Sequence, residues 1–228
     1  MNRKALASLV VLWIVLTIAS PVFAVYKNDF YAGGFLNIPA RGIKADISAP
    51  ATTLQRYTLE SNSNWVMVYN PSNASGQFMQ VGWRVWQTTT PVRFYEFCSS
   101  VVGCNNGTFG IHNWGESHSY LVSWSSGTTW CPYADAVNPT SSCKNLGIGY
   151  PLYSQVFSEM HYDPRNDMGA TFNNVNYLRP SDGLSVYVAP TSFTFSDDYP
   201  YTHSTLTSSF VTYRQITANQ NFGPIAIR

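Results

Sequence analysis

The chain has 228 residues with 13 basic and 12 acidic side chains, and only 11% of its residues are charged. Such a small and balanced charge gives no electrostatic surface for nucleic acid or for an anionic membrane, so we exclude both as partners. Aromatic residues make up 15% of the chain. This abundance, together with the scarcity of charged helix formers, favours strands over helices.

Residues 1–24 have the layout of a signal peptide. Two basic residues precede an unbroken apolar stretch over 5–18, and a short exit over 22–24 ends in alanine. The apolar stretch is shorter than the roughly 20 residues that a membrane span needs. An uncleaved anchor is the alternative, and the helix-breaking Pro21 disfavours it. We therefore expect a secreted protein, extracellular or periplasmic and free of the membrane, with a single domain over 25–228.

Hydrophobic side chains alternate with period two in short runs along the mature chain, and no long window shows helical periodicity. We predict strands at 65–69, 77–86, 92–97, 120–124, 156–161, 171–177, 184–188, 192–195 and 210–213. Turn-forming clusters separate them at 70–76, 88–91, 103–107, 125–127, 163–167 and 179–183. Many short strands predict an all-β fold, an antiparallel β-sandwich of two curved sheets. The stretch 104–150 has the weakest pattern, and we predict that it carries long, disulfide-stapled loops.

The four cysteines lie in the mature part of the chain. In an oxidising compartment they are expected to form two disulfides, for which three pairings exist. We favour Cys98–Cys104 and Cys131–Cys143, because each pair closes a local loop rich in turn residues. A zinc site is disfavoured because neither spacing is typical of metal ligands and no histidine stands beside them at ligand spacing.

Several common catalytic motifs are missing from the sequence. It has no G-x-S-x-G elbow, no H-E-x-x-H pair, no glycine-rich phosphate loop and no calcium loop. The four histidines, at 112, 118, 161 and 203, have no spacing that suggests a metal. Cysteine catalysis is disfavoured because disulfides account for all four thiols. We therefore predict no metal and no cofactor.

Polar residues inside otherwise apolar strands are the sequence's strongest chemical signal. On the strand predicted over 77–86, one face carries Met79, Val81, Trp83 and Val85, and the other carries Phe78, Gln80, Gly82, Arg84 and Trp86. The first face is predicted to be core. Gln80 then lies on the opposite face beside Gly82, which leaves room for a ligand to approach.

Two glutamates occupy similar positions in other predicted strands, Glu96 in VRFYEF and Glu159 in VFSEMHY. Taken singly, each is compatible with an ordinary solvated strand face. Glu159 is also close enough in sequence to pair with His161 or Arg165, which would be a stabilising contact and not a site.

Together these residues resemble a known pattern. QVG at 80–82, followed by an aromatic strand ending in FYEF at 94–97, resembles the part of the fungal glutamic peptidases (eqolisins) that carries their catalytic glutamine and a second glutamate. SQVFSE at 154–159 resembles the strand that carries their catalytic glutamate, at a similar separation along the chain. The resemblance implies that Gln80 and Glu159 form a catalytic pair.

The same stretches resemble the neprosin family, a related group of glutamic peptidases. Gly-Trp at 82–83, the local cystine, Met-Gly at 168–169 and the segment 33–50 all have counterparts there, within a resemblance that covers about residues 33–180. Plant neprosins have glutamate at the position of Gln80, so the implied pair is eqolisin-like. Phe-Ser, not Gly-Gly, precedes Glu159.

Our leading hypothesis is a monomeric, secreted endopeptidase of glutamic type that hydrolyses polypeptides at acidic pH. Glu159 can deprotonate water and return the proton, and the amide of Gln80 can stabilise an oxyanion. We assign supporting or substrate-binding roles to Glu96, Gly82, Trp86 and His161.

Two alternatives stay open at this point. The chain has seven tryptophans and fifteen tyrosines, and a non-catalytic sandwich could use such aromatics to bind glycan or cell-wall polymer. A carbohydrate hydrolase could use Glu96 and Glu159 as a carboxylate pair across a groove.

Overall fold

The computed structural model describes residues 29–50, 62–70, 76–86, 90–139, 142–149, 152–161, 167, 169–179, 187–188, 194–206 and 209–214. These residues form fifteen strands and no helix. No helix among them could therefore span a membrane. The predicted signal peptide lies outside the described residues.

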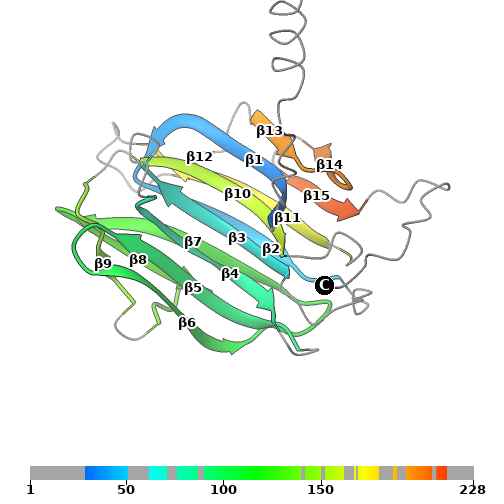
Figure 1. Ribbon diagram of the computed structural model, residues 1–228, viewed down its shortest axis with the longest axis horizontal. Helices are drawn as coiled ribbons and strands as arrows, with labels where there is room; N and C mark the ends of the chain where they lie inside the picture. Colours follow the sequence, from blue (N-terminus) through cyan, green and yellow to red (C-terminus); the bar gives the residue numbers. More distant parts are fainter. Residues whose placement is uncertain are drawn as a thin grey trace, which may run out of the picture.

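The strands form two antiparallel sheets (Figure 1). The seven-stranded sheet has the order β13 (Thr194–Asp197), β1 (Asp29–Ala40), β10 (Leu152–His161), β3 (Asn62–Tyr69), β4 (Phe78–Val85), β5 (Val92–Ser99) and β6 (Gly103–Ile111). The eight-stranded sheet has the order β14 (Tyr201–Leu206), β15 (Ser209–Arg214), β11 (Gly169–Leu178), β2 (Gly42–Ser48), β7 (Ser117–Ser126), β8 (Thr129–Ala134) and β9 (Lys144–Asn145), with β12 (Tyr187–Val188) paired to β11. The predicted β-sandwich is confirmed.

The core lies between the two sheets, and period-two alternation explains which side chains fill it. On β4 the predicted core face is confirmed, since Met79, Val81, Trp83 and Val85 are all at most 1% exposed. They pack against the eight-stranded sheet, where Ile43, Ile47, Tyr120, Val122 and Phe172 are fully buried. The alternate residues of β4 consequently face away from the core.

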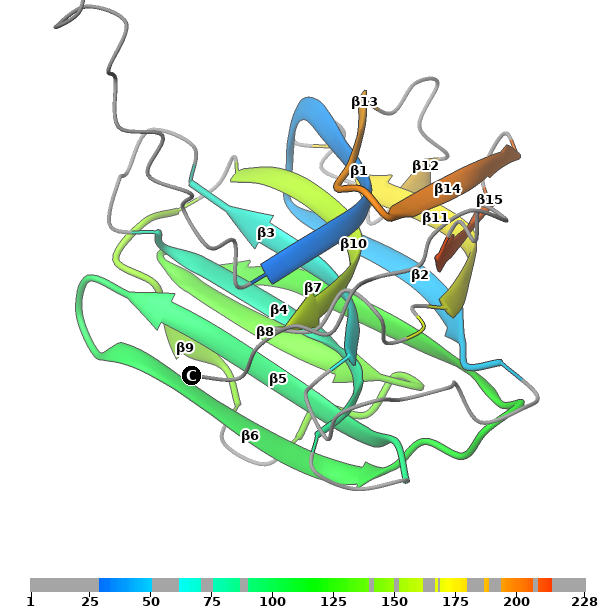
Figure 2. The same ribbon diagram turned by 45° about the vertical axis from the view of Figure 1, so that its right-hand side comes forward.

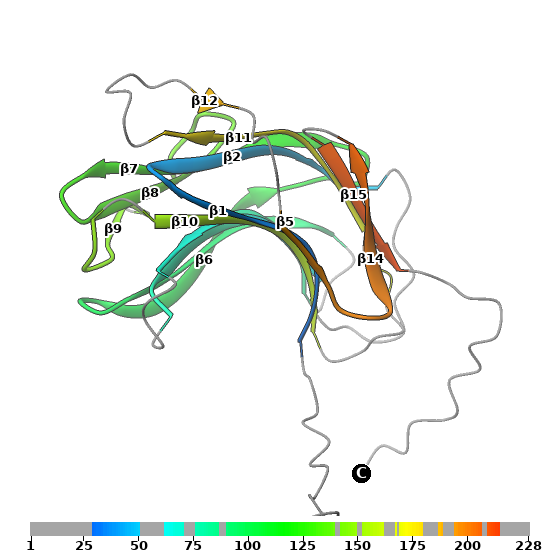
Figure 3. The same cartoon turned by 90° about the horizontal axis from the view of Figure 1, so that it is seen from above.

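The seven-stranded sheet is strongly curved, and its concave side faces away from the other sheet (Figure 3). β10 lies in its middle, between β1 and β3, although some 110 residues separate β1 from β10 along the chain (Figure 2). The concave face is thus assembled from strands that are distant in sequence.

Both predicted disulfides are present. Cys98 and Cys104 are directly opposite each other on β5 and β6, so the bond closes the hairpin between them. Cys131, on β8, is bonded to Cys143, which directly precedes β9. Among the described residues no cysteine is free.

The prediction of long loops over 104–150 is wrong, and so is the predicted turn at 103–107. The strands β6, β7, β8 and β9 occupy most of this stretch. The sequence did not predict β6, because β6 is the outer strand of its sheet and most of its residues are exposed on both faces. Such a strand needs no hydrophobic alternation. Of the strand predicted at 184–188, only 187–188 lie within the described residues.

Candidate active site

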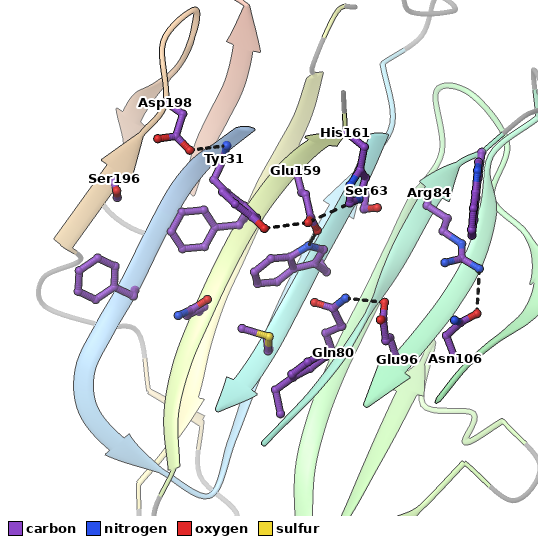
Figure 4. A pocket seen from close by; sticks show the side chains of 17 residues that line it. Tyr31, Ser63, Gln80, Arg84, Glu96, Asn106, Glu159, His161, Ser196 and Asp198 are labelled. Carbon is purple, nitrogen blue, oxygen red and sulfur yellow. Dashed lines mark hydrogen bonds and ion pairs between the residues drawn. The ribbon is translucent and has the colours of Figure 1, made fainter. Parts of the chain in front are cut away.

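A groove of about 720 Å³ crosses the concave face of the seven-stranded sheet (Figure 4). Each of the seven strands contributes at least one side chain to its lining. Five residues singled out in the sequence, Gln80, Trp86, Glu96, Glu159 and His161, are among the lining residues. The fold therefore gathers polar side chains from three separate parts of the chain into one hollow.

Glu159 is the most buried acid of this groove, with an exposed fraction of 9%. Its Oε1 accepts a hydrogen bond of 3.0 Å from the Tyr31 hydroxyl, and its Oε2 accepts one of 3.0 Å from the indole Nε1 of Trp65. Burial raises the pKa of this carboxyl, and these two hydrogen bonds and the nearby His161 oppose the increase. The result is a carboxyl group that two donors hold in position at the wall of the groove.

Gln80 lies on β4, across β3 from β10. On β3, Met67 is opposite both Gln80 and Gln155, so Gln80 and Glu159 stand on either side of β3, displaced by four residues along β10. Both side chains face the same groove. The two polar residues that the sequence singled out are thus on one face of one sheet.

Glu96 is directly opposite Gln80 on β5, and its Oε2 accepts a 3.1 Å hydrogen bond from the Gln80 Nε2. Arg93, three residues earlier on β5, forms its ion pair with Asp135, 3.1 Å away. Glu96 therefore fixes the amide orientation of Gln80 and leaves the second N–H of that amide unused by this contact.

His161 lies at the rim of the groove, two residues after Glu159 on β10. Its Nδ1 is 2.5 Å from the Asp29 carboxylate, and its Nε2 is 3.5 Å from Oε1 of Glu159. The ligating atoms of these three side chains lie within 4.8 Å of one another. Since Tyr31 and Trp65 already donate to Glu159, we interpret the trio as a row of polar contacts, with a hydrogen bond between His161 and Asp29, and not as a coordination shell.

Gly82 has a structural neighbour that the sequence did not reveal. A Cβ at this position would lie 1.8 Å from the Asn64 carbonyl oxygen and 2.8 Å from the Trp65 Cα, both in β3. The missing side chain therefore lets β3 and β4 approach each other. Trp86, by contrast, is 49% exposed at the edge of the groove, where a ligand could reach it.

A buried polar network supports the strands behind the site. The Asn64 Nδ2 donates to Asn62 Oδ1 at 2.9 Å, and the Ser158 hydroxyl donates to Asn64 Oδ1 and lies 2.6 Å from the Thr212 hydroxyl. All four residues are at most 2% exposed. The network joins β3 and β10 to β15 of the opposite sheet, and so fixes the strand segments that carry Ser63 and Glu159.

Sequence reasoning missed Tyr31 and Trp65 as partners of Glu159. Tyr31 is 128 residues away along the chain, and nothing local marks it. Trp65 was recognised only as the start of a strand. A second cluster, around His112 and His118, lies outside the groove, on the eight-stranded sheet and the segment before it. The sequence analysis considered these histidines only as metal ligands.

Comparisons with known proteins give the same architecture. A scytalido-glutamic peptidase bound to a peptide-based transition-state analogue matches with a TM-score of 0.61, at 12% sequence identity, over 83% of this chain and 99% of that chain. SCP-B, a member of the eqolisin family of peptidases solved with the tripeptide Ala-Ile-His, matches with a TM-score of 0.58, also at 12% identity and over 83% and 99% of the two chains. No family model matches the chain, and no curated protein does.

The chain thus has the fold of a glutamic peptidase. More narrowly, its arrangement is that of the eqolisin structures. At this level of identity the likeness concerns the fold alone, and the neprosin resemblance remains a prediction from the sequence.

Proposed function

We propose that this protein is a secreted endopeptidase of glutamic type, in which Glu159 and Gln80 hydrolyse peptide bonds in a polypeptide laid across the groove. One observation carries the proposal: both side chains line the same groove, and other groups of the site hold each of them in place. The eqolisin-like fold supports it. The two disulfides are compatible with secretion.

Glu159 acts as the base and then as the acid. Its ionised carboxylate takes a proton from a water molecule, whose oxygen attacks the carbonyl carbon of the scissile bond. The same carboxyl then gives this proton to the amide nitrogen as the carbon–nitrogen bond breaks. The products are a carboxylic acid and an amine, and the carboxylate is regenerated.

Gln80 stabilises the charge that develops on the carbonyl oxygen. One N–H of its amide is bound to Glu96, so the other has a defined direction when the oxyanion forms. A donor placed in advance costs no reorganisation during the reaction, and loss of such a donor typically reduces kcat by about 10²–10³-fold.

The working pH follows from the surroundings of Glu159. The base must be ionised, and burial raises its pKa above the ordinary value of a glutamate. The acidic working range is the expectation from the sequence, and within it the raised pKa places the rising limb of activity above the pH at which an exposed glutamate would ionise.

The test is hydrolysis of an acid-denatured protein by the purified, secreted chain, followed by gel and mass spectrometry. We expect Glu159→Gln to reduce kcat by at least 10²-fold, because the base is lost while the shape of the side chain is kept. Gln80→Ala should reduce kcat by about 10²-fold.

Glu116→Gln is the matched control, since it makes the same chemical change at an exposed position that does not line the groove. It should retain wild-type turnover. A Glu159→Gln protein that remains folded and cleaves at the wild-type rate would refute the proposal.

Glycan binding through surface aromatics has less support. Among the described residues only two aromatic side chains are exposed, Trp86 at 49% and Tyr199 at 60%. A flat aromatic platform of the kind that binds polysaccharide would need several.

A further inference from the structure

Arg84 is a cation inside the groove that the proposed chemistry does not use. It lies on the groove-facing side of β4, and its guanidinium carbon is 5.0 Å from the ring centres of both Trp86 and Phe94. Its Nη2 donates a 3.3 Å hydrogen bond to the Asn106 Oδ1. Two rings and an amide therefore hold the guanidinium in one orientation.

Among the described residues, no carboxylate neutralises this guanidinium at close range. Within the part of the chain that the structure describes, no ion pair within 4.0 Å involves Arg84, whereas Arg93 pairs with Asp135. Glu96 is the acid that acts on Arg84 from a greater distance, and burial lowers the Arg84 pKa. The arginine keeps its charge all the same, because guanidinium groups are not deprotonated in proteins.

The strand register places Arg84 close to the proposed base. Glu159, Ser63 and Arg84 are direct neighbours across β10, β3 and β4. The backbones of Glu159 and Arg84 are thus two strand spacings apart, roughly 10 Å, which an extended peptide covers in about three residues. The short side chain of Ser63 leaves the path between them open.

Charge is distributed unevenly along the groove (Figure 4). Asp198 lies at the end near β1, where it accepts a 2.9 Å hydrogen bond from the Tyr31 backbone N–H. Arg84 lies at the opposite end, where the nearby Glu96 carboxylate accepts a hydrogen bond from the Gln80 amide. A negatively charged side chain is attracted to the Arg84 end and repelled from the Asp198 end.

We propose, on the basis of the proposed peptidase function, that Arg84 is a specificity-determining residue that binds an aspartate or glutamate side chain of the substrate. This acidic residue lies within about three residues of the cleaved bond, always on the same side of it. The fork of the guanidinium matches a carboxylate, and Trp86 and Phe94 exclude water from the pair.

The experiment is cleavage-site profiling of a random-sequence peptide library by mass spectrometry, with kcat/KM measured on peptide pairs that differ only in Glu against Gln at the selected position. The wild-type protein should prefer the Glu peptide roughly tenfold, which is the effect of about one charge-assisted hydrogen bond. Arg84→Gln should bring this Glu/Gln ratio close to one. Arg84→Glu should lower the ratio below one, and its library profile should show a preference for a basic residue at the same position.

Arg41→Gln is the matched control, because Arg41 also stacks on a tryptophan, 4.6 Å from the Trp124 ring, but does not line the groove. It should keep the wild-type ratio. Arg84→Lys tests the charge if Arg84→Gln folds poorly, and it should retain part of the preference.

The outcomes separate the two proposals. Cleavage without a preference for acidic residues, or a preference that survives in Arg84→Gln, overturns the role of Arg84 and leaves the peptidase function standing. No cleavage of any library peptide by the wild-type protein overturns the peptidase function and this subsite with it.

Discussion

At the scale of single residues, the charge state of Glu159 is set by opposing neighbours. Burial and the carboxylate of Asp29 raise its pKa, whereas His161, Trp65 and Tyr31 lower it. Asp29 also contacts the Nδ1 of His161 and so fixes the orientation of the ring beside the carboxyl of Glu159. Of these two neighbours, His161 favours the ionised form of Glu159 that a base requires, and Asp29 opposes it.

Replacement of His161 by glutamine should move the rising limb of kcat/KM against pH to higher pH. The limb reports ionisation of Glu159 in the free enzyme, and the variant lacks a positive charge that lowers the Glu159 pKa. A pH series of initial rates measures the shift. His203→Gln is the control, because His203 forms a similar 2.6 Å pair with Asp197 but does not line the groove. A limb that stays in place in His161→Gln would contradict the interpretation.

The resemblance to glutamic peptidases led us to predict that Gln80, Glu96, Glu159 and His161 belong to one site, and all four line the same groove. The partners of Glu159 could not be predicted in the same way. Tyr31 reaches Glu159 only because β1 pairs with β10. Such long-range pairing depends on how the whole sheet is ordered, which local patterns do not encode.

At the scale of elements, β4 shows how closely the strands of the groove are packed. Its inward face fills the core, its outward face carries Gln80 and Arg84, and Gly82 between them touches the backbone of β3. The alternation that placed these faces was visible in the sequence. The close approach of β4 to β3 could not be predicted from the sequence, because the only residue that signals a contact between two backbones is the glycine itself.

Gly82→Ala should therefore destabilise the protein by roughly 3 kcal/mol, since a methyl group 1.8 Å from the Asn64 carbonyl oxygen forces β3 and β4 apart. Urea unfolding measures the loss. Gly107→Ala is the matched control on the outer strand β6, where the new methyl group meets only the movable Tyr95 ring at 2.8 Å. It should cost less, and an equal loss in both variants would show that the β3 contact is not the cause.

At the scale of the whole molecule, a buried histidine makes the stability of the fold depend on pH in the acidic range. His112 is completely buried, stacks on Tyr120 and lies near Trp83 and His118. Its Nδ1 is 2.7 Å from the Tyr120 hydroxyl, and its Nε2 lies 3.3 Å from the Glu116 carbonyl oxygen. Burial, followed by the charge of His118 and that of Arg93, lowers the His112 pKa to about 4.

This pKa predicts a loss of stability in acid. Between the unfolded value of about 6.5 and the folded value of about 4, the unfolded chain binds the proton and the folded one does not, so stability falls as the pH falls through this window. His112 accounts for a loss of about 3 kcal/mol in the free energy of unfolding across this pH window. Urea unfolding at a series of pH values should show a shallower loss for His112→Gln than for the wild-type protein. Parallel curves would contradict the assignment.

Glu159 acts in the opposite direction, because its raised pKa makes the fold more stable as it becomes protonated.

The central place of β10 also determines when a working site can exist. The groove needs Tyr31, Trp65, Gln80 and Glu159 together, and β10 enters between β1 and β3 only after residues 152–161 have been made. Until then β1 and β3 have no common partner. Such non-local pairing is slow compared with hairpin formation. Under the proposed peptidase function, a growing or partly folded chain would therefore hydrolyse neither itself nor its neighbours, and activity would begin only when the fold is complete.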